Sequence, residues 1–269
     1  MLELEHGFRV VDVHARLEPE ASRRPREGMG EPERLEREMH QAGVVRAVAY
    51  SDYRERGYLK ANNAVARMTV GRPMVAFARV DGARDPGDGA GSRLRNITAS
   101  REEYHTSPED IEQYAYDDRF VGFKLHPARD GLPDEAVLEA LAAVDKPILV
   151  HGGEAFPPSA VEEHFLQYDL PVIVGHFGAH PLRRDLMHES IDLLEAYDQC
   201  YLETSAVRYR DPLERAIMEH PDRVCFGSGA PNVHPNVAVM EILTLDVPED
   251  AMKKVFSNNP VRVIEELAP

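Results

Sequence analysis

The chain has 269 residues, 43% of them hydrophobic, and a formal net charge of -16. This length and apolar content suit one globular domain with a sizeable core, and they argue against a disordered chain. The negative charge argues against nucleic acid and anionic membranes as partners, because both would repel the protein.

Two further features bear on the cellular compartment. No run of 18 apolar residues is present, and residues 1–12 lack the basic-then-apolar layout of a secretory signal. Cys200 and Cys225 both lie in apolar, strand-like stretches, which favours reduced and buried thiols over a disulfide. We therefore expect a cytoplasmic protein without a membrane partner.

Eight short apolar segments recur along the chain, each followed by polar residues. They are rich in Val and Ile and apolar on both faces, which is typical of parallel strands covered by helices. The segments are residues 8–15, 44–50, 73–80, 120–126, 147–153, 171–178, 200–206 and 223–229.

Stretches with helical spacing follow most of these strands, and several of them begin with Pro or Asp. They are residues 31–43, 60–68, 133–144, 158–168, 185–198 and 211–220, and residues 235 to the end are expected to be terminal helices. This alternation predicts a single-domain (β/α)₈ TIM barrel over residues 1–269. A doubly wound open sheet is the alternative, disfavoured because no G-x-G-x-x-G follows the first strand.

One segment interrupts the alternation. Residues 81–110 are rich in Gly, Asp and Ser, which predicts a loop excursion that acts as a lid or is simply mobile.

Histidines and charged residues stand where the predicted strands end. TIM-barrel enzymes collect their chemistry at the carboxyl ends of the strands, so these side chains are expected to share one site. The residues are Asp12, His14 and Arg16 on the first strand, Lys124 and His126 on the fourth, His151 on the fifth, and His176 and His180 on the sixth.

With these motifs the chain resembles the amidohydrolase superfamily, specifically the amidohydrolase-2 group of metal-dependent hydrolases and decarboxylases. The resemblance covers essentially the whole chain. It depends on VDVHAR (11–16), QAGVVRAV (41–48), GFKLHP (122–127), ILVHGG (148–153), VIVGHFGAH (172–180), YLETSA (201–206), RVCFGSGAPN (223–232) and NNPVRVI (258–264).

The resemblance implies a metal site. In the family, a first-strand D-x-H-x-H supplies two ligands, the histidine of the fifth strand a third, and the histidine of the sixth strand polarises the substrate or lies beside the metal. The aspartate of F-G-S-D-x-P on the last strand binds the metal and acts as general base. His14, His151 and His176 match these positions, whereas Arg16 and Gly229 replace a histidine and the aspartate.

These two replacements change the expected chemistry. A catalytic zinc usually keeps three protein ligands and an open position for water. Arginine cannot be a ligand, because guanidinium stays protonated and offers only donors. The metal, expected to be a divalent ion such as zinc, would therefore be held by His14, His151 and His176.

Three functions remain open. In the first, the chain is a metal-dependent hydrolase or decarboxylase of a small carboxylate-bearing molecule, with His176, Asp12 or Glu203 as catalytic groups. In the second, the barrel is metal-free and uses histidines for acid–base work in an anion pocket. In the third, the barrel is catalytically inactive and only binds a small anionic ligand. The residues expected to bind substrate are Arg16, Lys124, His126 and Arg208. By resemblance, a homodimer is expected.

Overall fold

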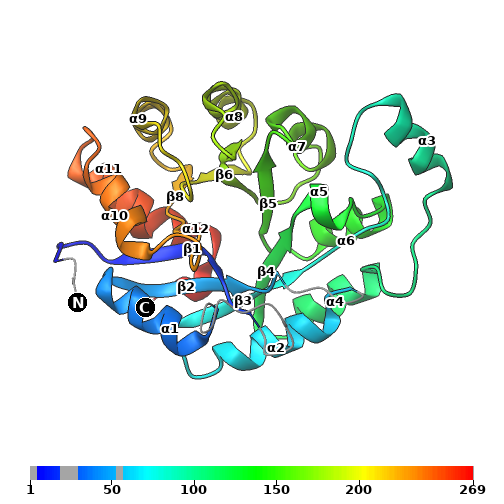
Figure 1. Ribbon diagram of the computed structural model, residues 1–269, viewed down its shortest axis with the longest axis horizontal. Coiled ribbons are helices and arrows are strands. Elements are labelled where there is room, and N and C mark those ends of the chain that lie inside the picture. The colour runs from blue at the N-terminus through cyan, green and yellow to red at the C-terminus, as the bar shows by residue number, and fades with distance from the viewer. Residues whose placement is uncertain (1–4, 19–29, 53–56, 269) are drawn as a thin grey trace.

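The computed structural model describes residues 5–18, 30–52 and 57–268. Its eight parallel strands lie in chain order in one sheet, and helices cover the outer side (Figure 1). The strands are β1 (Val10–Arg16), β2 (Val44–Tyr50), β3 (Met74–Arg79), β4 (Phe120–Leu125), β5 (Ile148–Gly153), β6 (Val172–His180), β7 (Cys200–Glu203) and β8 (Val224–Cys225). The predicted (β/α)₈ barrel is confirmed.

The ring closes beside β8, which is only two residues long. Val13 N donates to Phe226 O at 3.0 Å, and Arg16 N donates to Ala230 O at 2.8 Å. Between these bonds, Gly229 N donates to His14 O at 2.9 Å. Residues 226–230 therefore lie along β1 and place the FGSGA stretch next to His14.

The helices follow the predicted segments to within a few residues, and the terminal helices are present. They are α1 (Pro32–Gln41), α2 (Leu59–Thr69), α3 (Ala90–Thr98), α4 (Pro108–Tyr116), α5 (Pro127–Asp130), α6 (Glu135–Ala143), α7 (Pro158–His164), α8 (Arg184–Ala196), α9 (Arg210–Glu219), α10 (Pro235–Leu243), α11 (Glu249–Lys253) and α12 (Asn259–Val263). A π-helical turn (Lys254–Asn258) and a 3₁₀ turn (Glu265–Leu267) flank α12. None of the helices in the described ranges is long and apolar enough to cross a membrane.

The segment 81–110 is more regular than the loop we expect from its composition. It contains α3 and the start of α4, and it projects from the barrel wall (Figure 1). Asn96 on α3 bonds to both the N–H and the C=O of Asp85, at 2.7 and 3.0 Å. A capping box between Ser107 and Asp110 starts α4. These local hydrogen bonds give order to a segment whose Gly and Ser content predicts a loop.

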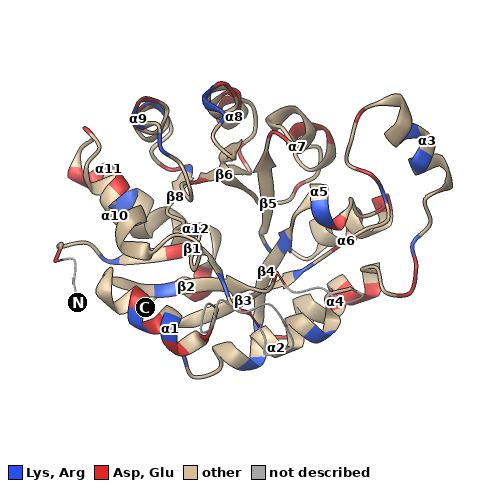
Figure 2. Cartoon of the chain, viewed as in Figure 1, with Lys and Arg blue, Asp and Glu red and all other residues tan. Residues whose placement is uncertain are grey.

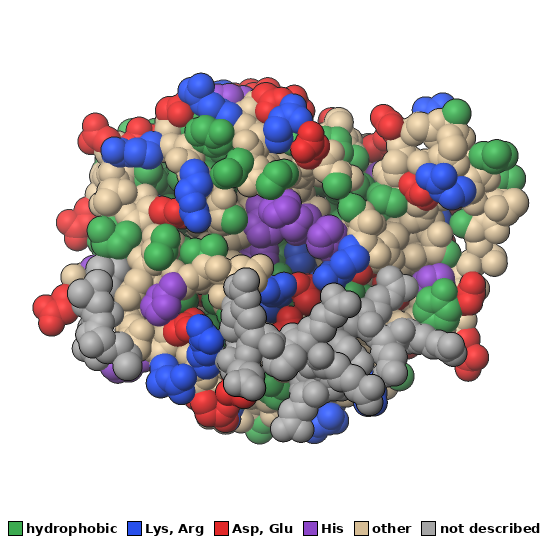
Figure 3. All heavy atoms as spheres, in the orientation of Figure 1, with side chains coloured by type: hydrophobic (Ala, Val, Ile, Leu, Met, Phe, Trp, Pro, Cys, Tyr) green, Lys and Arg blue, Asp and Glu red, His purple; other side chains and the backbone are tan. Residues whose placement is uncertain are grey.

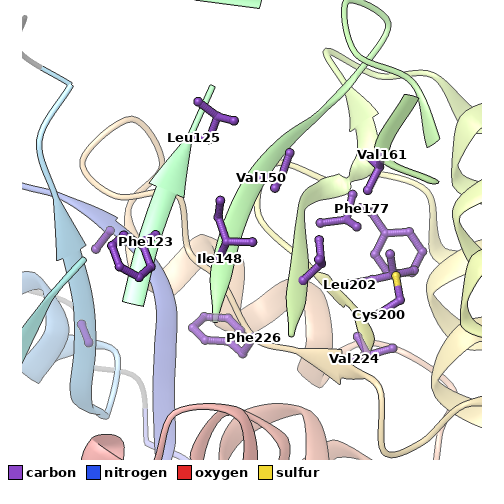
Figure 4. Close-up of a cluster of buried hydrophobic side chains, with 14 of the residues drawn as sticks. Phe123, Leu125, Ile148, Val150, Val161, Phe177, Cys200, Leu202, Val224 and Phe226 are labelled. Carbon is purple, nitrogen blue, oxygen red and sulfur yellow. The ribbon is translucent and has the colours of Figure 1, made fainter. Parts of the chain in front are cut away.

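The core has two layers. An outer layer between strands and helices includes Phe123, Ile148, Val150, Leu202 and Phe226 (Figure 4). An inner layer fills the barrel with Val, Leu, Ile and Phe side chains and extends to Ile264 and Leu267 after α12. Apolar side chains therefore fill the barrel below the carboxyl ends of its strands.

Cys200 and Cys225 are buried and free, as their sequence context predicts. Burial raises the pKa of the Cys200 thiol to about 12, so it is not reactive at neutral pH.

Candidate functional site

Polar side chains gather at the carboxyl ends of the strands. Histidine side chains surround a hollow near the centre of the face shown in Figure 3, and Lys and Arg side chains lie beside them. Most other charged residues lie on the covering helices and the loops (Figure 2). The hollow is therefore the candidate site.

Glu203 at the end of β7 is the central acceptor of the site. Its Oε1 accepts hydrogen bonds from His14 Nδ1 at 2.7 Å, from His176 N at 2.5 Å and from Ser205 Oγ at 2.8 Å. Its Oε2 accepts from Ser205 N at 2.7 Å. Burial opposes ionisation, but His14 and these hydrogen bonds outweigh it and lower the pKa of Glu203. Glu203 is therefore a buried carboxylate.

The glycine of the FGSG motif makes room for this carboxylate. A Cβ at Gly227 would lie 2.1 Å from Glu203 Oε2 and 3.0 Å from Glu203 Cδ. Cβ atoms essentially never make contacts this short, so the position of the Glu203 side chain requires a glycine at position 227.

His14 links Glu203 to β2. Its ring is buried, and His14 Nε2 lies 2.6 Å from the hydroxyl of Tyr50. Both ring nitrogens of His14 are therefore already hydrogen-bonded.

A row of histidines extends from Ser205. Ser205 Oγ lies 2.8 Å from His176 Nδ1, and His176 Nε2 lies 3.1 Å from His151 Nδ1. The His151 ring stacks on His126 at 3.8 Å between centroids, and its centroid lies 4.8 Å from that of His180. The four histidines predicted from β4, β5 and β6 are thus brought together.

These rings are neutral at pH 7. Burial lowers the pKa of His176 to about 3 and that of His126 to about 4. Burial also lowers the pKa of His151, and neighbouring His176 and Lys124 add to the effect.

The backbone is strained where β6 meets the site. His176 and Phe177 both have φ 55°, a left-handed conformation that costs a non-glycine residue about 1–2 kcal/mol. The strain turns the chain so that His176 reaches both Ser205 and His151.

The opposite side of the mouth is an ion network. The buried Arg79 guanidinium donates from Nε and Nη2 to Asp130 Oδ2 at 2.9 and 2.7 Å, and from Nη1 to Asp52. Asp52 also pairs with Arg16 and, at 3.1 Å, with Arg129. Burial raises the pKa of Asp130, but Arg79 and Arg129 outweigh this and lower it. Every charge of this network has an opposite partner.

Lys124 lies between the two sides and differs from both. Its ammonium is buried, without a hydrogen-bond partner in the described ranges, and lies 5.3 Å from the centroid of the Tyr50 ring. Burial, with a further contribution from Arg79, lowers the pKa of Lys124 to about 7. His126 Nδ1 is also buried without a partner among the residues described. Within the part of the chain that the structure describes, these two buried nitrogens of the mouth thus have no hydrogen-bond partner.

Asp12 links two neighbouring segments of the barrel by hydrogen bonds. Its Oδ1 accepts from His14 N and from Ser228 N, both at 2.9 Å, and its Oδ2 accepts from Ser228 Oγ at 2.5 Å. Burial raises the pKa of Asp12, and the Ser228 bonds oppose this. The carboxylate predicted as a catalytic group ties β1 to residues 226–230.

The two arginines predicted to bind substrate have protein partners. Arg16 pairs with Asp52 and donates to Asn232 Oδ1 at 2.7 Å. Arg208 is 45% exposed and pairs with Glu241 on α10. Arg208 lines a small depression together with His176 and His180, so it lies at the rim.

The predicted zinc ligands do not converge on one point. The nitrogens of His14 face Glu203 and Tyr50, whereas His151 Nδ1 faces His176. The mouth group that does converge, with donor atoms within 4.8 Å of one another, is His14, His176 and Glu203. In that group Ser205 Oγ already contacts the Nδ1 atoms of both histidines.

Two further residues near the mouth are also unsuited to a cation. Gly229 offers no ligand atom, and Lys124 adds a buried amine nearby. These donor atoms therefore fit a hydrogen-bonded cluster better than a metal centre.

Several site residues are not predicted by the sequence reasoning, namely Tyr50, Ser205, Arg79, Asp52 and Asp130. Tyr50, Arg79 and Asp52 stand at or just past the ends of β2 and β3, and Ser205 stands two residues after the predicted Glu203. Their position at strand ends is the signal that could have identified them.

The comparisons agree with this architecture. The amidohydrolase family model matches residues 11–265. No curated protein matches the chain. An uncharacterised TIM-barrel protein from Bordetella bronchiseptica is 17% identical with a TM-score of 0.69, covering 97% of this chain and 99% of that one.

Two enzymes share the fold at similar identity. A dihydroxybenzoic acid decarboxylase from Polaromonas, solved with manganese and the inhibitor 2-nitroresorcinol, is 16% identical with a TM-score of 0.64, covering 97% and 98% of the two chains. A probable 2-pyrone-4,6-dicarboxylic acid hydrolase from Acinetobacter baumannii, with bound citric acid, is 13% identical with a TM-score of 0.61, covering 95% and 99%. The family match spans nearly all of the barrel, and the chain belongs to the amidohydrolase family.

Proposed function

We propose that the barrel mouth binds a small carboxylate-bearing molecule, and that the chain hydrolyses or decarboxylates it with its own side chains as acid, base and anion site. The observation that carries this proposal is the buried ammonium of Lys124, which has no hydrogen-bond partner among residues 5–18, 30–52 and 57–268.

A buried ammonium without a partner is unfavourable unless something neutralises it. The nearby acids Glu203, Asp52 and Asp130 are occupied by His14, Ser205 and the arginines. A carboxylate that enters the hollow would supply the missing charge to Lys124, and a polar group of the same molecule would satisfy His126. The small-molecule ligands of the Polaromonas and Acinetobacter proteins agree with a ligand of this size.

The neutral histidines suit acid–base work. In hydrolysis, a histidine nitrogen would remove a proton from water as its oxygen attacks the carbonyl carbon, and Lys124 would stabilise the oxygen that gains negative charge. The carbonyl would then re-form as the C–N or C–O bond breaks, and the histidine would return its proton to the departing nitrogen or oxygen. In decarboxylation, Lys124 would stabilise the electron pair left when carbon dioxide departs, and a proton would then return to that carbon. General acid–base catalysis of this kind contributes about 10²- to 10⁴-fold in rate.

Calorimetric titration with 2,6-dihydroxybenzoate and with citrate tests the binding part. We expect at least one probe to bind, and Lys124→Met to weaken it at least tenfold. Lys146→Met is the matched control, because Lys146 loses the same charge but bonds to Phe120 O at the opposite end of β4. Equal affinity of all three proteins, or no binding of these or related carboxylates, would contradict the proposal. Turnover is then measured with aromatic carboxylates, lactones and small amides.

A metal-dependent form is the second candidate, because His14, His176 and Glu203 converge and because the Polaromonas relative contains manganese. Elemental analysis after growth with zinc and manganese tests it, with the His14→Ala/His151→Ala double variant as the negative control. About one ion per chain, absent from the variant, would support this candidate. Arg16→His/Gly229→Asp, which restores the family's ligands, is the positive control.

The cytoplasmic location and the homodimer also belong to this proposal. Cell fractionation and sedimentation velocity test them, and a monomer at micromolar concentration would contradict the homodimer.

A further inference from the structure

We infer that the carboxylate of Glu203 and the hydroxyl of Ser205 fix the proton positions along a chain of histidines, and that His151 Nε2 is the unprotonated nitrogen at its end. Ser205 is thus a positioning residue and His151 is the base. This deepens the proposed function and rests on it for the role of His151 in the reaction.

The inference starts from Glu203, since an ionised carboxylate only accepts hydrogen bonds. His14 Nδ1, 2.7 Å from Glu203 Oε1, therefore carries a proton. The other ring nitrogen, His14 Nε2, lies 2.6 Å from the hydroxyl of Tyr50. The series of hydrogen bonds that runs from Glu203 through His14 ends at Tyr50.

A second series of hydrogen bonds runs from Glu203 through Ser205. A serine hydroxyl donates one hydrogen bond and accepts two. Ser205 Oγ donates to Glu203 Oε1 at 2.8 Å, so both of its remaining contacts must be accepted ones. These contacts are His14 Nδ1 at 3.1 Å and His176 Nδ1 at 2.8 Å, which saturates the hydroxyl.

The backbone supports the same assignment. His176 Nδ1 also lies 3.2 Å from the carbonyl oxygen of Ser205, and a carbonyl oxygen cannot donate. His176 therefore carries its proton on Nδ1, and its Nε2 is an acceptor.

The proton position of His176 determines that of His151. His176 Nε2 accepts across 3.1 Å, so His151 Nδ1 carries the proton. Since the ring is neutral, His151 Nε2 has a lone pair, and none of the residues described in the structure hydrogen-bonds to that nitrogen. His151 is partly exposed at the mouth and is held in plane by stacking on His126. A base with a fixed proton position is thus presented where a substrate would bind.

Nitrogen-15 NMR of histidine-labelled, chelator-treated protein tests the assignment, because the two tautomers of a neutral imidazole have different nitrogen shifts. We expect the Nδ1–H tautomer at His176 and His151. An unconstrained neutral histidine prefers the Nε2–H tautomer, so this result is diagnostic. Asparagine substitutions of single histidines assign the signals.

Variants separate positioning from packing. Ser205→Ala should increase the Nε2–H fraction of His176 and His151, whereas Ser205→Thr, which keeps the hydroxyl, should restore the wild-type spectrum. Ser190→Ala is the matched control, since this buried serine hydroxyl on α8 has no partner in the described part of the chain. The Nε2–H tautomer at His151 in the wild type would overturn the inference, and so would a spectrum unchanged by Ser205→Ala.

Kinetics on a substrate found by the turnover screen give a second readout. Ser205→Ala should lower kcat about tenfold or more with little change in KM, because the base is misoriented while Lys124 still holds the carboxylate. If the spectra are as expected but no carboxylate binds, the proposed function fails and the inference stands. If carboxylates bind and His151 has its proton on Nε2, the inference alone fails.

Discussion

The two sides of the barrel mouth solve the problem of buried polar groups differently. On the β2–β4 side, Arg79 is surrounded by Asp130 and Asp52, and every charge is paired. On the β5–β7 side, Glu203 is the central carboxylate, and histidine rings are arranged around it by directional hydrogen bonds. A paired ion network holds a shape, whereas a row of neutral histidines can accept or donate a proton. The contrast indicates that the β2–β4 side stabilises the fold and that the β5–β7 side supplies the groups for proton transfer.

The largest effect is expected from breaking the ion network. Asp130→Asn leaves the Arg79 cation buried with only part of its partner charge, which should lower the free energy of unfolding by about 3–5 kcal/mol. Chemical denaturation at pH 7 measures this. Asp134→Asn is the control, because the Asp134 side chain is 41% exposed and caps α6, and asparagine caps equally well. A loss under 1 kcal/mol for Asp130→Asn would mean that the network is not structural.

The network should also respond to acid. The folded-state pKa of Asp130 lies below its unfolded value, so its contribution is present above the unfolded pKa of about 3.8 and is lost as the pH falls below it. The wild type should therefore lose its advantage over Asp130→Asn in that acid range.

A somewhat smaller effect is expected on the histidine side. Glu203→Gln keeps the shape but places an amide where His14, Ser205 and His176 all donate to Oε1, and should cost about 2–3 kcal/mol. It should also abolish turnover, because the proton positions are no longer fixed. Thermal unfolding and activity are compared with Glu154→Gln, an exposed control. If Glu203→Gln kept full activity, the β5–β7 side would also serve only to stabilise the fold.

The sequence predicts the barrel because alternating apolar strands and amphipathic helices follow from local periodicity. It also predicts the histidine cluster, since His126, His151 and His176 stand at strand ends. It does not predict the partners, because Glu203 and Ser205 meet His14 from nearly 190 residues away, and such pairings depend on barrel closure. The same limit applies to Asp12, predicted as catalytic and found bonded to Ser228, 216 residues later. The sequence motif directs attention to Gly229, but only the structure shows that Gly227 is the glycine required by Glu203.

Lys124 lies between the two sides. Its substitution should increase the stability of the fold, by less than Asp130→Asn and Glu203→Gln decrease it. Lys124→Met removes a buried ammonium and should raise the free energy of unfolding at pH 7 by about 2 kcal/mol while weakening carboxylate binding at least tenfold. The unfolded chain binds more protons than the folded one between pH 7 and about 10.5, so wild-type stability rises with pH there. The difference in the free energy of unfolding between the wild type and Lys124→Met should therefore narrow from pH 7 to 9.5. A destabilised Lys124→Met protein would mean that the ammonium has a partner in the fold.

The smallest effect is expected at Arg208. This side chain is 45% exposed and pairs with Glu241, so Arg208→Ala should change the free energy of unfolding by at most about 0.5–1 kcal/mol. Affinity for 2,6-dihydroxybenzoate should be unchanged, because the Glu241 pair already holds the guanidinium against α10. Calorimetric titration checks both Arg208→Ala and Glu241→Gln. A tenfold loss of affinity in Arg208→Ala, together with tighter binding in Glu241→Gln, would mean that the arginine leaves its partner to reach the ligand. Arg208 at the rim would then take part in ligand binding, and the ligand-binding part of the mouth would extend past α9.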